Sequence, residues 1–365
     1  MKRRLTVTAI VMLALSVPAL AQQTIGELIH ESGLREGPIA LRDVPGWSAS
    51  RKIVVWDRRS QLSELQTRYP DANIVIVSSL QDALSHAADA GAIVGSCDSE
   101  LLAAAKRVTW VQIFSSGAER CVSSPRITSG KVVLSNMQKM SSPAIAEHAI
   151  AMLLSLTRNL PQFSRIMEDG RWAREPADTA GMSMVAGKTL LVLGLGGIGS
   201  EVAWRAHALG MKVIGTRNSK REGPPFVEYV GLADETLALA SRSDFIVNAL
   251  PLTNATRGLL DADFFAAVPR GAYFINVGRG ATVDTDALVD ALRSKRLAGA
   301  GLDVTDPEPL PSGHPLWKLD NVLITPHIST SGGDGTRHRL LLLENLERYL
   351  AGDAPLNAVD PQKGY

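Results

Sequence analysis

A glycine-rich segment, GLGGIG at residues 194–199, is the feature that most constrains the fold of this chain. It follows the apolar run LLVL, which is typical of a buried strand, and it precedes a helical stretch, SEVAWRAHALG. In this position Gly194 allows a tight turn, Gly196 lets the backbone approach a pyrophosphate, and Gly199 permits close packing of helix on strand. The helix N-terminus also offers unpaired N–H groups to phosphates. The segment predicts a dinucleotide-binding turn, with a chance glycine loop as the alternative.

The glycine loop lies in the second of two sets of strands that alternate with helical stretches. The first set is expected at Lys52–Trp56, Asn73–Val77, Ala92–Val94, Thr109–Ile113 and Val132–Leu134. The second set is expected at Leu190–Leu193, Lys212–Gly215, Phe245–Asn248, Ala272–Asn276, Ala300–Val304 and Val322–Ile324. This alternation indicates parallel sheets joined by right-handed crossovers. We therefore predict an α/β protein with two doubly wound parallel-sheet domains and a ligand cleft between them.

Length and composition exclude several other classes of protein. A chain of 365 residues is long enough for two cores, and its net charge of +1 gives no indication of nucleic-acid binding. No Cys/His spacing typical of a zinc site is present, so no metal is predicted. The cysteines, Cys97 and Cys121, are expected to be unpaired and buried, and a disulfide in an oxidising compartment is the alternative.

Three charged or titratable residues follow consecutive strands of the second set. Arg279 follows YFINV, Glu308 follows GAGLDV and His327 follows VLITP. The carboxyl ends of such strands hold ligand contacts in doubly wound sheets. A guanidinium there can bind a carboxylate bidentately, a histidine can transfer a proton, and a neighbouring carboxylate would fix the histidine's tautomer. Each residue alone is more often structural, but together they predict a catalytic group. Among the other histidines, His148 on a long helix is expected to have a packing role.

These segments resemble the NAD(P)-dependent D-2-hydroxyacid dehydrogenase family, and within it the glyoxylate/hydroxypyruvate reductases. The resemblance covers residues 52–351 and is carried by SPAIAEHAIAMLLSLTRNLP, VLGLGGIGSEVAWRAHALGMKVIG, LPLTNATRGLL, FINVGRGATVDTDAL, GAGLDVTDPEPL and NVLITPHIS. It implies a flavodoxin-like substrate domain, residues 22–137 with the returning segment 331–365, and a Rossmann nucleotide-binding domain, residues 138–330. It also implies hydride transfer between a nicotinamide cofactor and a small 2-keto or D-2-hydroxy acid.

The resemblance also implies roles for individual residues at the substrate. Arg279 matches the arginine that binds the substrate carboxylate and keto oxygen, Glu308 matches the acid, and His327 matches the proton donor and acceptor. The loop SSGAER matches the substrate-binding loop, in which the backbone N–H groups of Ser116 and Gly117 would hold the substrate.

Around the cofactor, the resemblance implies contacts from separate segments of the chain. They are Gly194, Gly196, Gly197, Ile198, Gly199, Thr216, Arg217, Asn218, Leu250, Pro251, Val277, Gly278, Asp303 and Ser142. Enzymes that use NAD carry an acid at the end of the second strand, where this chain has Arg217, with Lys220 and Arg221 close behind. We therefore expect NADP(H) to be preferred, with NAD(H) possible, and a solvated basic loop as the alternative.

Residues 1–21 are expected to form a signal peptide. Lys2–Arg4 is basic, Leu5–Val17 is apolar and Ala19–Ala21 has the small-x-small pattern of a cleavage site. The apolar run is shorter than the ~20 residues of a spanning helix, so an uncleaved anchor is the minority alternative. We expect export to a bacterial periplasm and no membrane contact after cleavage. A cytoplasmic location is the alternative, because soluble nicotinamide cofactor is a cytoplasmic resource.

Two other functions compete with a 2-keto acid reductase. One is a dehydrogenase of another small anion, such as formate or phosphite, but formate enzymes of this superfamily carry glutamine at the position of Glu308. The other is a non-catalytic NAD(P)-sensing protein, against which the retained Arg279, Glu308 and His327 argue. Relatives are usually dimers built on the nucleotide domain, so a homodimer is expected.

Overall fold

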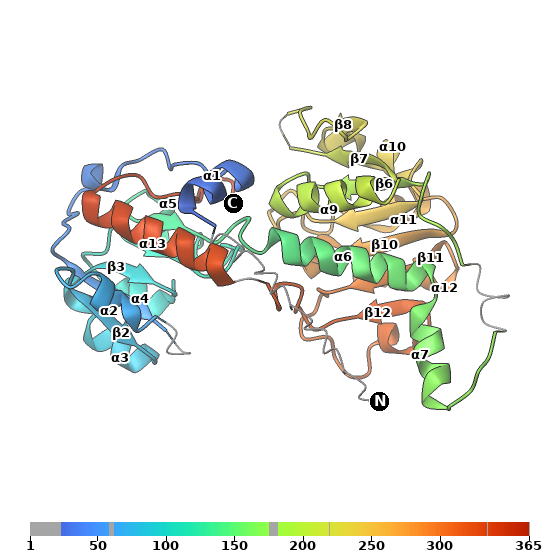
Figure 1. The fold of residues 1–365 in the computed structure, drawn as a ribbon, viewed down its shortest axis with the longest axis horizontal. Coiled ribbons are helices and arrows are strands. Elements are labelled where there is room, and N and C mark those ends of the chain that lie inside the picture. The colour runs from blue at the N-terminus through green and yellow to red at the C-terminus, as the bar shows by residue number, and fades with distance from the viewer. Residues whose placement is uncertain (1–22, 58–61, 175–181, 219, 334, 365) are drawn as a thin grey trace, which may run out of the picture.

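The computed structural model describes residues 23–57, 62–174, 182–218, 220–333 and 335–364. The expected signal peptide, residues 1–21, lies outside the described residues. The described chain forms two sheets, each with helices on both faces, and the two layered bodies lie beside one another (Figure 1). Within these ranges, no helix has the length and apolar content needed to cross a membrane.

The N-terminal domain contains a five-stranded parallel sheet in the order β2-β1-β3-β4-β5. Its strands are β1 (Lys52–Trp56), β2 (Ile74–Val77), β3 (Ala90–Val94), β4 (Trp110–Gln112) and β5 (Val133–Ser135). The order is that of a flavodoxin-like sheet, which confirms the predicted fold of this domain. The strands read as short apolar runs because helices bury both faces of the sheet.

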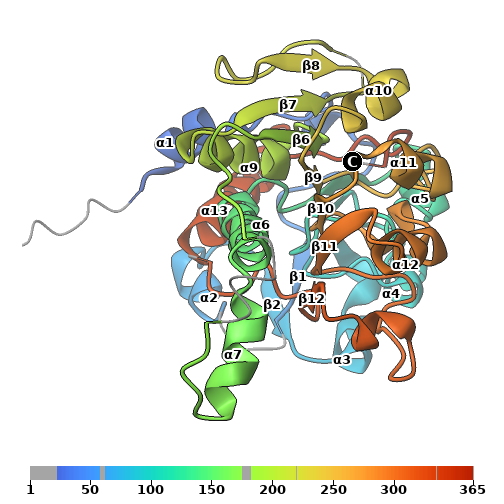
Figure 2. The same ribbon diagram turned by 90° about the vertical axis from the view of Figure 1, so that its right-hand side faces the viewer.

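Helices from both ends of the chain cover one face of this sheet. They are α1 (Ile25–Ser32), α2 (Glu64–Arg68) and α13 (Gly335–Ala351), and the opposite face carries α3 (Leu80–Ser85), α4 (Ser99–Ala104) and α5 (Pro125–Thr128). Leu341, Leu346 and Tyr349 of α13 are fully buried in the first of these cores. The C-terminal helix therefore belongs to the N-terminal core, where it lies beside α1 (Figures 1 and 2).

The second domain contains a seven-stranded parallel sheet in the order β12-β11-β10-β9-β6-β7-β8. Its strands are β6 (Thr189–Leu193), β7 (Lys212–Thr216), β8 (Tyr229–Gly231), β9 (Phe245–Asn248), β10 (Ala272–Asn276), β11 (Leu297–Leu302) and β12 (Val322–Ile324). The expectation of six strands is wrong by one, because β8 was not predicted. It is a three-residue edge strand, too short to show a periodic pattern. The strand order reverses between β6 and β9, which is the switch point where doubly wound sheets bind ligands.

The two faces of this sheet are covered by α6 (Ser142–Thr157) with α9 (Gly197–Ala208), and by α10 (Thr236–Ala240), α11 (Ala262–Ala267) and α12 (Thr285–Arg293). Short 3₁₀ turns occur at Leu41–Asp43, Ala87–Asp89, Ala233–Glu235, Gly280–Thr282 and Pro315–Lys318. A further helix, α7 (Leu160–Glu168), has no buried residue and protrudes from the domain (Figure 2).

Close packing of α6 on the sheet fixes the start of that helix near the glycine loop. A Cβ at Gly301 of β11 would lie 2.9 Å from the Cβ of Met152, so only glycine lets α6 approach β11 this closely. At the other end of α6, the Oγ of Ser142 would lie 2.8 Å from a Cβ at Gly197. The helix therefore meets the first turn of α9 directly.

Cys97 and Cys121 form a disulfide, so the expectation that they are unpaired is wrong. Cys97 follows β3 and Cys121 follows β4, and these neighbouring parallel strands bring their carboxyl-end loops together with the two Cα atoms 5.5 Å apart. The spacing of the cysteines in the sequence does not predict the disulfide, because the two residues are close only when β3 and β4 are neighbours in the sheet. The bond fastens the loop that contains Ser116 and Gly117 to the loop after β3.

Candidate active site

Three adjacent strands bring the predicted catalytic residues to one edge of the second sheet. β10 pairs with β11 and β11 pairs with β12, all in parallel, and Arg279, Glu308 and His327 follow these strands in that order. The turn after Arg279 packs on the segment that leads to Glu308, because a Cβ at Gly280 would lie 1.9 Å from the carbonyl oxygen of Thr305. The three side chains therefore extend from loops at the carboxyl ends of neighbouring strands.

Glu308 and His327 form a direct pair. The Nδ1 of His327 lies 2.7 Å from Oε1 of Glu308, and both side chains remain about two-fifths exposed. When Nδ1 is protonated, its N–H donates a hydrogen bond to the Glu308 carboxylate. The other ring nitrogen, Nε2, is then free to exchange a proton with a ligand. The backbone of His327 is in the left-handed region, at φ 53°, a conformation that is concentrated at functional sites when the residue is not glycine.

Asp303 holds the loop that carries this histidine. Its carbonyl oxygen accepts a hydrogen bond of 2.8 Å from the backbone N–H of His327. Its carboxylate accepts from the hydroxyl of Thr325 at 2.7 Å and from the N–H groups of Ile328 and Ser329 at 2.9 and 3.1 Å. Burial raises the pKa of Asp303, but the hydrogen bonds from Ser329, Thr325 and Ile328 outweigh it and hold the pKa below its ordinary value. The buried carboxylate is therefore ionised at neutral pH.

His148 of α6 makes polar contacts at the edge of this site rather than the packing role that was expected. Its Nε2 lies 2.9 Å from the hydroxyl oxygen of Thr325 and 3.7 Å from Oδ1 of Asp303. The pair of contacts links α6 to the loop that carries His327.

Arg279 is held from the opposite domain by Glu119, a residue to which the sequence assigned no role. The Nε of Arg279 donates to Oε1 of Glu119 at 2.9 Å, and one terminal N–H donates to the carbonyl of Gly278 at 2.8 Å. Both side chains of the ion pair are about one-third exposed. A Cβ at Gly117 would lie 2.1 Å from a terminal nitrogen of Arg279, so the loop fits closely against the guanidinium only because it has glycine there.

The predicted substrate loop presents its backbone to this guanidinium. The carbonyl of Ser116 accepts from the amide of Asn136 at 2.7 Å, and the carbonyl of Gly117 accepts from the hydroxyl of Ser115 at 2.8 Å. In the part of the chain that the structure describes, the N–H groups of Ser116 and Gly117 donate to no protein acceptor. They are therefore available to an anionic ligand beside Arg279.

The glycine loop has the geometry of a phosphate-binding turn. Gly194 has φ 88°, and a Cβ at Gly199 would lie 2.1 Å from the carbonyl oxygen of Gly194. Around a Cβ built at Gly196 no atom lies within 4 Å, so this backbone faces open space. Gly197 and Ile198 begin α9, and the N–H groups of a first helical turn have no partner within the helix. Phosphate oxygens fit such a turn.

The end of β7 carries the residues expected at the adenosine ribose. Thr216 holds the glycine loop, because its hydroxyl oxygen accepts from the N–H of Gly194 at 3.1 Å. The next residue, Arg217, is half-buried, and its Nε is a buried donor with no acceptor among the described residues. Asn218 follows and is exposed. A buried guanidinium donor that has no acceptor among the described residues can pair with an anionic group of a ligand.

The remaining expected cofactor contacts lie at the same edge of the sheet. Leu250 and Pro251 follow β9, Val277 and Gly278 follow β10, and Ser142 begins α6. A Cβ at Gly278 would lie 2.8 Å from the carbonyl oxygen of Leu250, so the two segments are in contact.

A buried amide network that was not predicted holds these segments. Asn248 and Asn276 end β9 and β10, and the Nδ2 of Asn248 donates to Oδ1 of Asn276 at 3.0 Å and to the hydroxyl of Thr282 at 2.8 Å. The N–H groups of Leu250 and Gly278 donate to these asparagines at 3.2 and 3.1 Å. Both strands are apolar except for a final asparagine, in FIVN and in YFIN. This pattern could have indicated the network from the sequence.

A hollow of about 1310 Å³ lies in the N-terminal domain beside α13, next to the predicted substrate loop. Trp56, Gly95 and Phe114 are among the residues that line it, whereas Arg279 and His327 are not. The catalytic candidates are therefore defined by their contacts, not by this cavity.

The fold and these contacts define a dinucleotide-binding α/β protein with an imidazole–carboxylate pair and a guanidinium at the same edge of the sheet. Residues 150–329 match the family described as D-isomer specific 2-hydroxyacid dehydrogenase, NAD binding domain. The chain is 32% identical to a glyoxylate reductase of Korarchaeum cryptofilum, over 73% of this chain and 80% of the relative. It is 40% identical to the human glyoxylate reductase/hydroxypyruvate reductase, over 57% of this chain and 64% of the relative.

A solved structure agrees with these sequence matches. The D-isomer specific 2-hydroxyacid dehydrogenase of Xanthobacter autotrophicus Py2, in complex with NADPH and MES, aligns with a TM-score of 0.73 and 30% identity. The alignment covers 87% of this chain and all of that chain. The chain therefore belongs to the D-isomer specific 2-hydroxyacid dehydrogenase family, whose members are oxidoreductases that act on CH–OH groups with a nicotinamide cofactor.

Proposed function

We propose that this enzyme reduces a small 2-keto acid of the glyoxylate or hydroxypyruvate type to the D-2-hydroxy acid, and catalyses the reverse oxidation. The 2.7 Å contact between Glu308 and His327 carries the proposal, because it supplies a positioned acid–base group at the sheet edge that also carries Arg279. Similarity to the archaeal and human glyoxylate reductases supports the substrate class.

In the proposed mechanism, the chain orients the acid and delivers a proton. The terminal nitrogens of Arg279, with the N–H groups of Ser116 and Gly117, bind the carboxylate and polarise the keto group. Bound NADPH supplies the hydride for the keto carbon. His327, protonated on both nitrogens, donates the Nε2 proton to the developing alkoxide, while Glu308 holds Nδ1–H and stabilises the imidazolium.

Turnover of a panel of anions tests this function directly. The full chain is assayed with glyoxylate, hydroxypyruvate, pyruvate, formate and phosphite, each with NADPH or NADP⁺ in the appropriate direction. Reduction of glyoxylate or hydroxypyruvate with the highest kcat/KM is the expected result. Oxidation of formate or phosphite at a higher kcat/KM than any 2-keto acid reaction would contradict the substrate class, and no turnover at all would contradict an enzymatic role.

NADP(H) is the proposed cofactor, because the unpartnered Nε of Arg217 lies where NAD enzymes carry an acid for the ribose hydroxyl. The ratio of kcat/KM with NADPH to that with NADH measures the preference. Arg217→Asp should reverse it, because a carboxylate repels the 2′-phosphate and accepts hydrogen bonds from a free ribose. An unchanged ratio would contradict this assignment.

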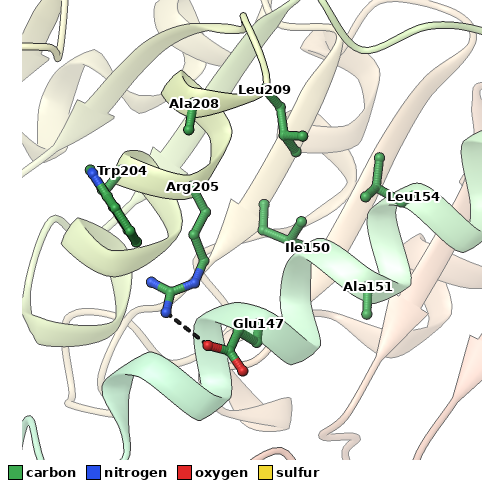
Figure 3. A pocket seen from close by; sticks show the side chains of 8 residues that line it. All are labelled: Glu147, Ile150, Ala151, Leu154, Trp204, Arg205, Ala208 and Leu209. Carbon is green, nitrogen blue, oxygen red and sulfur yellow. Dashed lines mark hydrogen bonds and ion pairs between the residues drawn. The ribbon is translucent and has the colours of Figure 1, made fainter. Parts of the chain in front are cut away.

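A homodimer is proposed on the nucleotide domain. An apolar groove lies between α6 and α9, lined by Ile150, Leu154, Trp204 and Leu209 (Figure 3). Trp204 is 54% exposed, and an ion pair of 3.0 Å between Arg205 and Glu147 crosses the groove. The protruding α7 and the segment after it expose Leu160, Met167 and Trp172. A second copy of the chain would bury both apolar surfaces around one twofold axis.

Sedimentation velocity at micromolar concentration tests the dimer. The wild-type chain should sediment as a dimer, and Trp204→Glu should shift it to the monomer because it places a charge in the apolar groove. Trp317→Glu, at another exposed tryptophan, is the matched control and should leave the dimer intact. A monomeric wild-type chain would contradict the proposal.

Export is proposed for the whole chain, supported by the disulfide between Cys97 and Cys121, which is a bond typical of oxidising compartments. Cell fractionation with N-terminal sequencing tests it. A periplasmic protein that begins at Gln22 is the expected result, and a cytoplasmic protein that retains Met1 would contradict it.

A further inference from the structure

Three segments that each carry a cation meet at the glycine loop: Lys139 covers Gly197 and reaches the carbonyl of Gly33, and Thr216 contacts Gly194. Arg35 follows α1, Lys139 lies between β5 and α6, and Arg217 follows β7. Burial and then the positive charges of Arg35 and Arg217 lower the pKa of Lys139. Both charges that act on this ammonium group are therefore positive, and among the described residues Arg35, Lys139 and Arg217 form no ion pair with a carboxylate.

Lys139 lies directly over the start of α9. A Cβ at Gly197 would lie 2.8 Å from the Cγ of Lys139, so the lysine side chain covers the glycine and fills the space that a larger residue would need. The Nζ donates to the backbone carbonyl of Gly33 at 2.5 Å, which places the charge next to the N-terminal segment. Lys139 therefore bridges the N-terminal domain and the phosphate-binding turn.

The backbone of Lys139 is in a costly conformation. Its φ of 73° lies in the left-handed region, which is unfavourable for a residue that has a Cβ. Glycine would relieve this strain but would remove the ammonium group. Strain of this kind is concentrated at ligand sites, where the surroundings hold the residue in place.

Arg217 has a buried guanidinium nitrogen that could bind an anion. Its buried Nε has no acceptor among the described residues, and an unpaired buried donor destabilises a folded protein. A dianionic phosphate at this position would pair with that donor and neutralise the repulsion among the three cations. The end of the second strand is the place where a doubly wound domain meets the 2′ position of the adenosine ribose.

We propose that Arg35 and Lys139, both outside the nucleotide-binding sheet, join Arg217 in one anion site that binds the 2′-phosphate of NADP(H). The inference rests on the proposed preference for NADP(H) and deepens it, because it adds the N-terminal domain to the cofactor site. Because α1 lies next to α9 (Figures 1 and 2), the 2′-phosphate would join the segment after α1 to the start of α9. NAD(H) has no group that can do so.

Calorimetric titration of nucleotide fragments tests this site without any turnover. The probes are 2′,5′-ADP, which carries the 2′-phosphate, and 5′-AMP, which lacks it. Lys139→Met should weaken 2′,5′-ADP about tenfold, as expected for one lost charge-assisted hydrogen bond, with no more than a small change for 5′-AMP. Arg35→Gln should weaken the same probe, and Lys139→Arg should retain its affinity. Lys212→Met, an exposed lysine at the opposite end of β7, is the matched control.

The outcomes separate this inference from the proposed function. If wild-type protein binds 2′,5′-ADP no more tightly than 5′-AMP, the NADP(H) preference itself is wrong. If wild-type protein prefers 2′,5′-ADP and Lys139→Met leaves that preference intact, only the three-cation site is wrong. Equal weakening of both probes would also overturn it, because the lysine would then act on the 5′-phosphate or on the fold. Thermal unfolding of the ligand-free variants shows that they are folded, so that a selective loss of 2′,5′-ADP affinity is assigned to the anion site.

Discussion

The carboxylate of Glu119 accepts a 2.9 Å hydrogen bond from the Nε of Arg279, across the contact between the two domains. The bond fixes the plane of the guanidinium and leaves terminal N–H groups for a substrate carboxylate. It also makes the substrate-binding arginine depend on a residue of the opposite domain.

Glu119 is therefore expected to act as a positioning residue. Glu119→Ala should lower kcat/KM for the 2-keto acid about tenfold, chiefly through KM, because the guanidinium loses one oriented hydrogen bond. Glu119→Gln should retain most of the activity, since its amide oxygen still accepts from Nε. Glu100→Ala, at an exposed glutamate of α4, is the control. Equal losses in the Ala and Gln variants would contradict a positioning role through this bond.

The disulfide is expected to stabilise the N-terminal domain. Cys97 and Cys121 enclose a segment with a sequence separation of 24, so replacing both with alanine should lower the free energy of unfolding by about 3 kcal/mol. Urea unfolding of wild-type protein with and without reductant gives the comparison. The variant should unfold at the same urea concentration in both conditions. A wild-type midpoint that reductant does not change would show that the bond contributes nothing.

Two glycines of the phosphate-binding turn are expected to respond differently to alanine. Gly199→Ala places a Cβ 2.1 Å from a backbone oxygen and should reduce the Tm of the ligand-free protein. Gly196→Ala meets no atom within 4 Å and should leave that Tm unchanged, but it should weaken NADP⁺ because the methyl group faces the phosphates. Thermal unfolding and calorimetric titration measure the two effects. Tight binding of NADP⁺ to Gly196→Ala would show that the cofactor does not approach this backbone.

Asp303 is expected to make stability depend on pH. Its pKa in the folded protein is lowered, so the ionised form favours folding. The stabilisation is complete above the unfolded pKa of about 3.9 and is lost as the pH falls through the lower folded value. The difference in free energy of unfolding between wild type and Asp303→Asn should be constant from neutral pH to about pH 5 and shrink below about pH 4. A difference that grows as the pH falls would contradict the assignment.

The sequence predicted the layered fold well because parallel strands buried on both faces appear as separate apolar runs. Strands such as β1 and β9 have the bounds that were expected. The edge strand β8 was missed because three residues carry no periodicity. The pairing of Cys97 with Cys121 was missed because it depends on which strands are neighbours.

At the candidate site, the residues that follow strand ends could be predicted from the sequence. Residues whose roles depend on contacts between distant segments could not. Glu308 and His327 could be paired in advance because their strands are consecutive in the chain and in the sheet. Glu119 could not be assigned a role, because its partner Arg279 lies in the other domain. Lys139 could not be recognised either, since its position over Gly197 follows from the packing of α6 against α9.

One rate comparison tests whether His327 transfers the proton in catalysis. The kcat for glyoxylate reduction with saturating NADPH is measured for wild type and for His327→Ala, with NADPH binding checked by calorimetry. The variant should bind NADPH normally and lose roughly 10²–10⁴ in kcat. A variant with wild-type kcat would contradict the proton-transfer role of His327, because the proton would then come from another group.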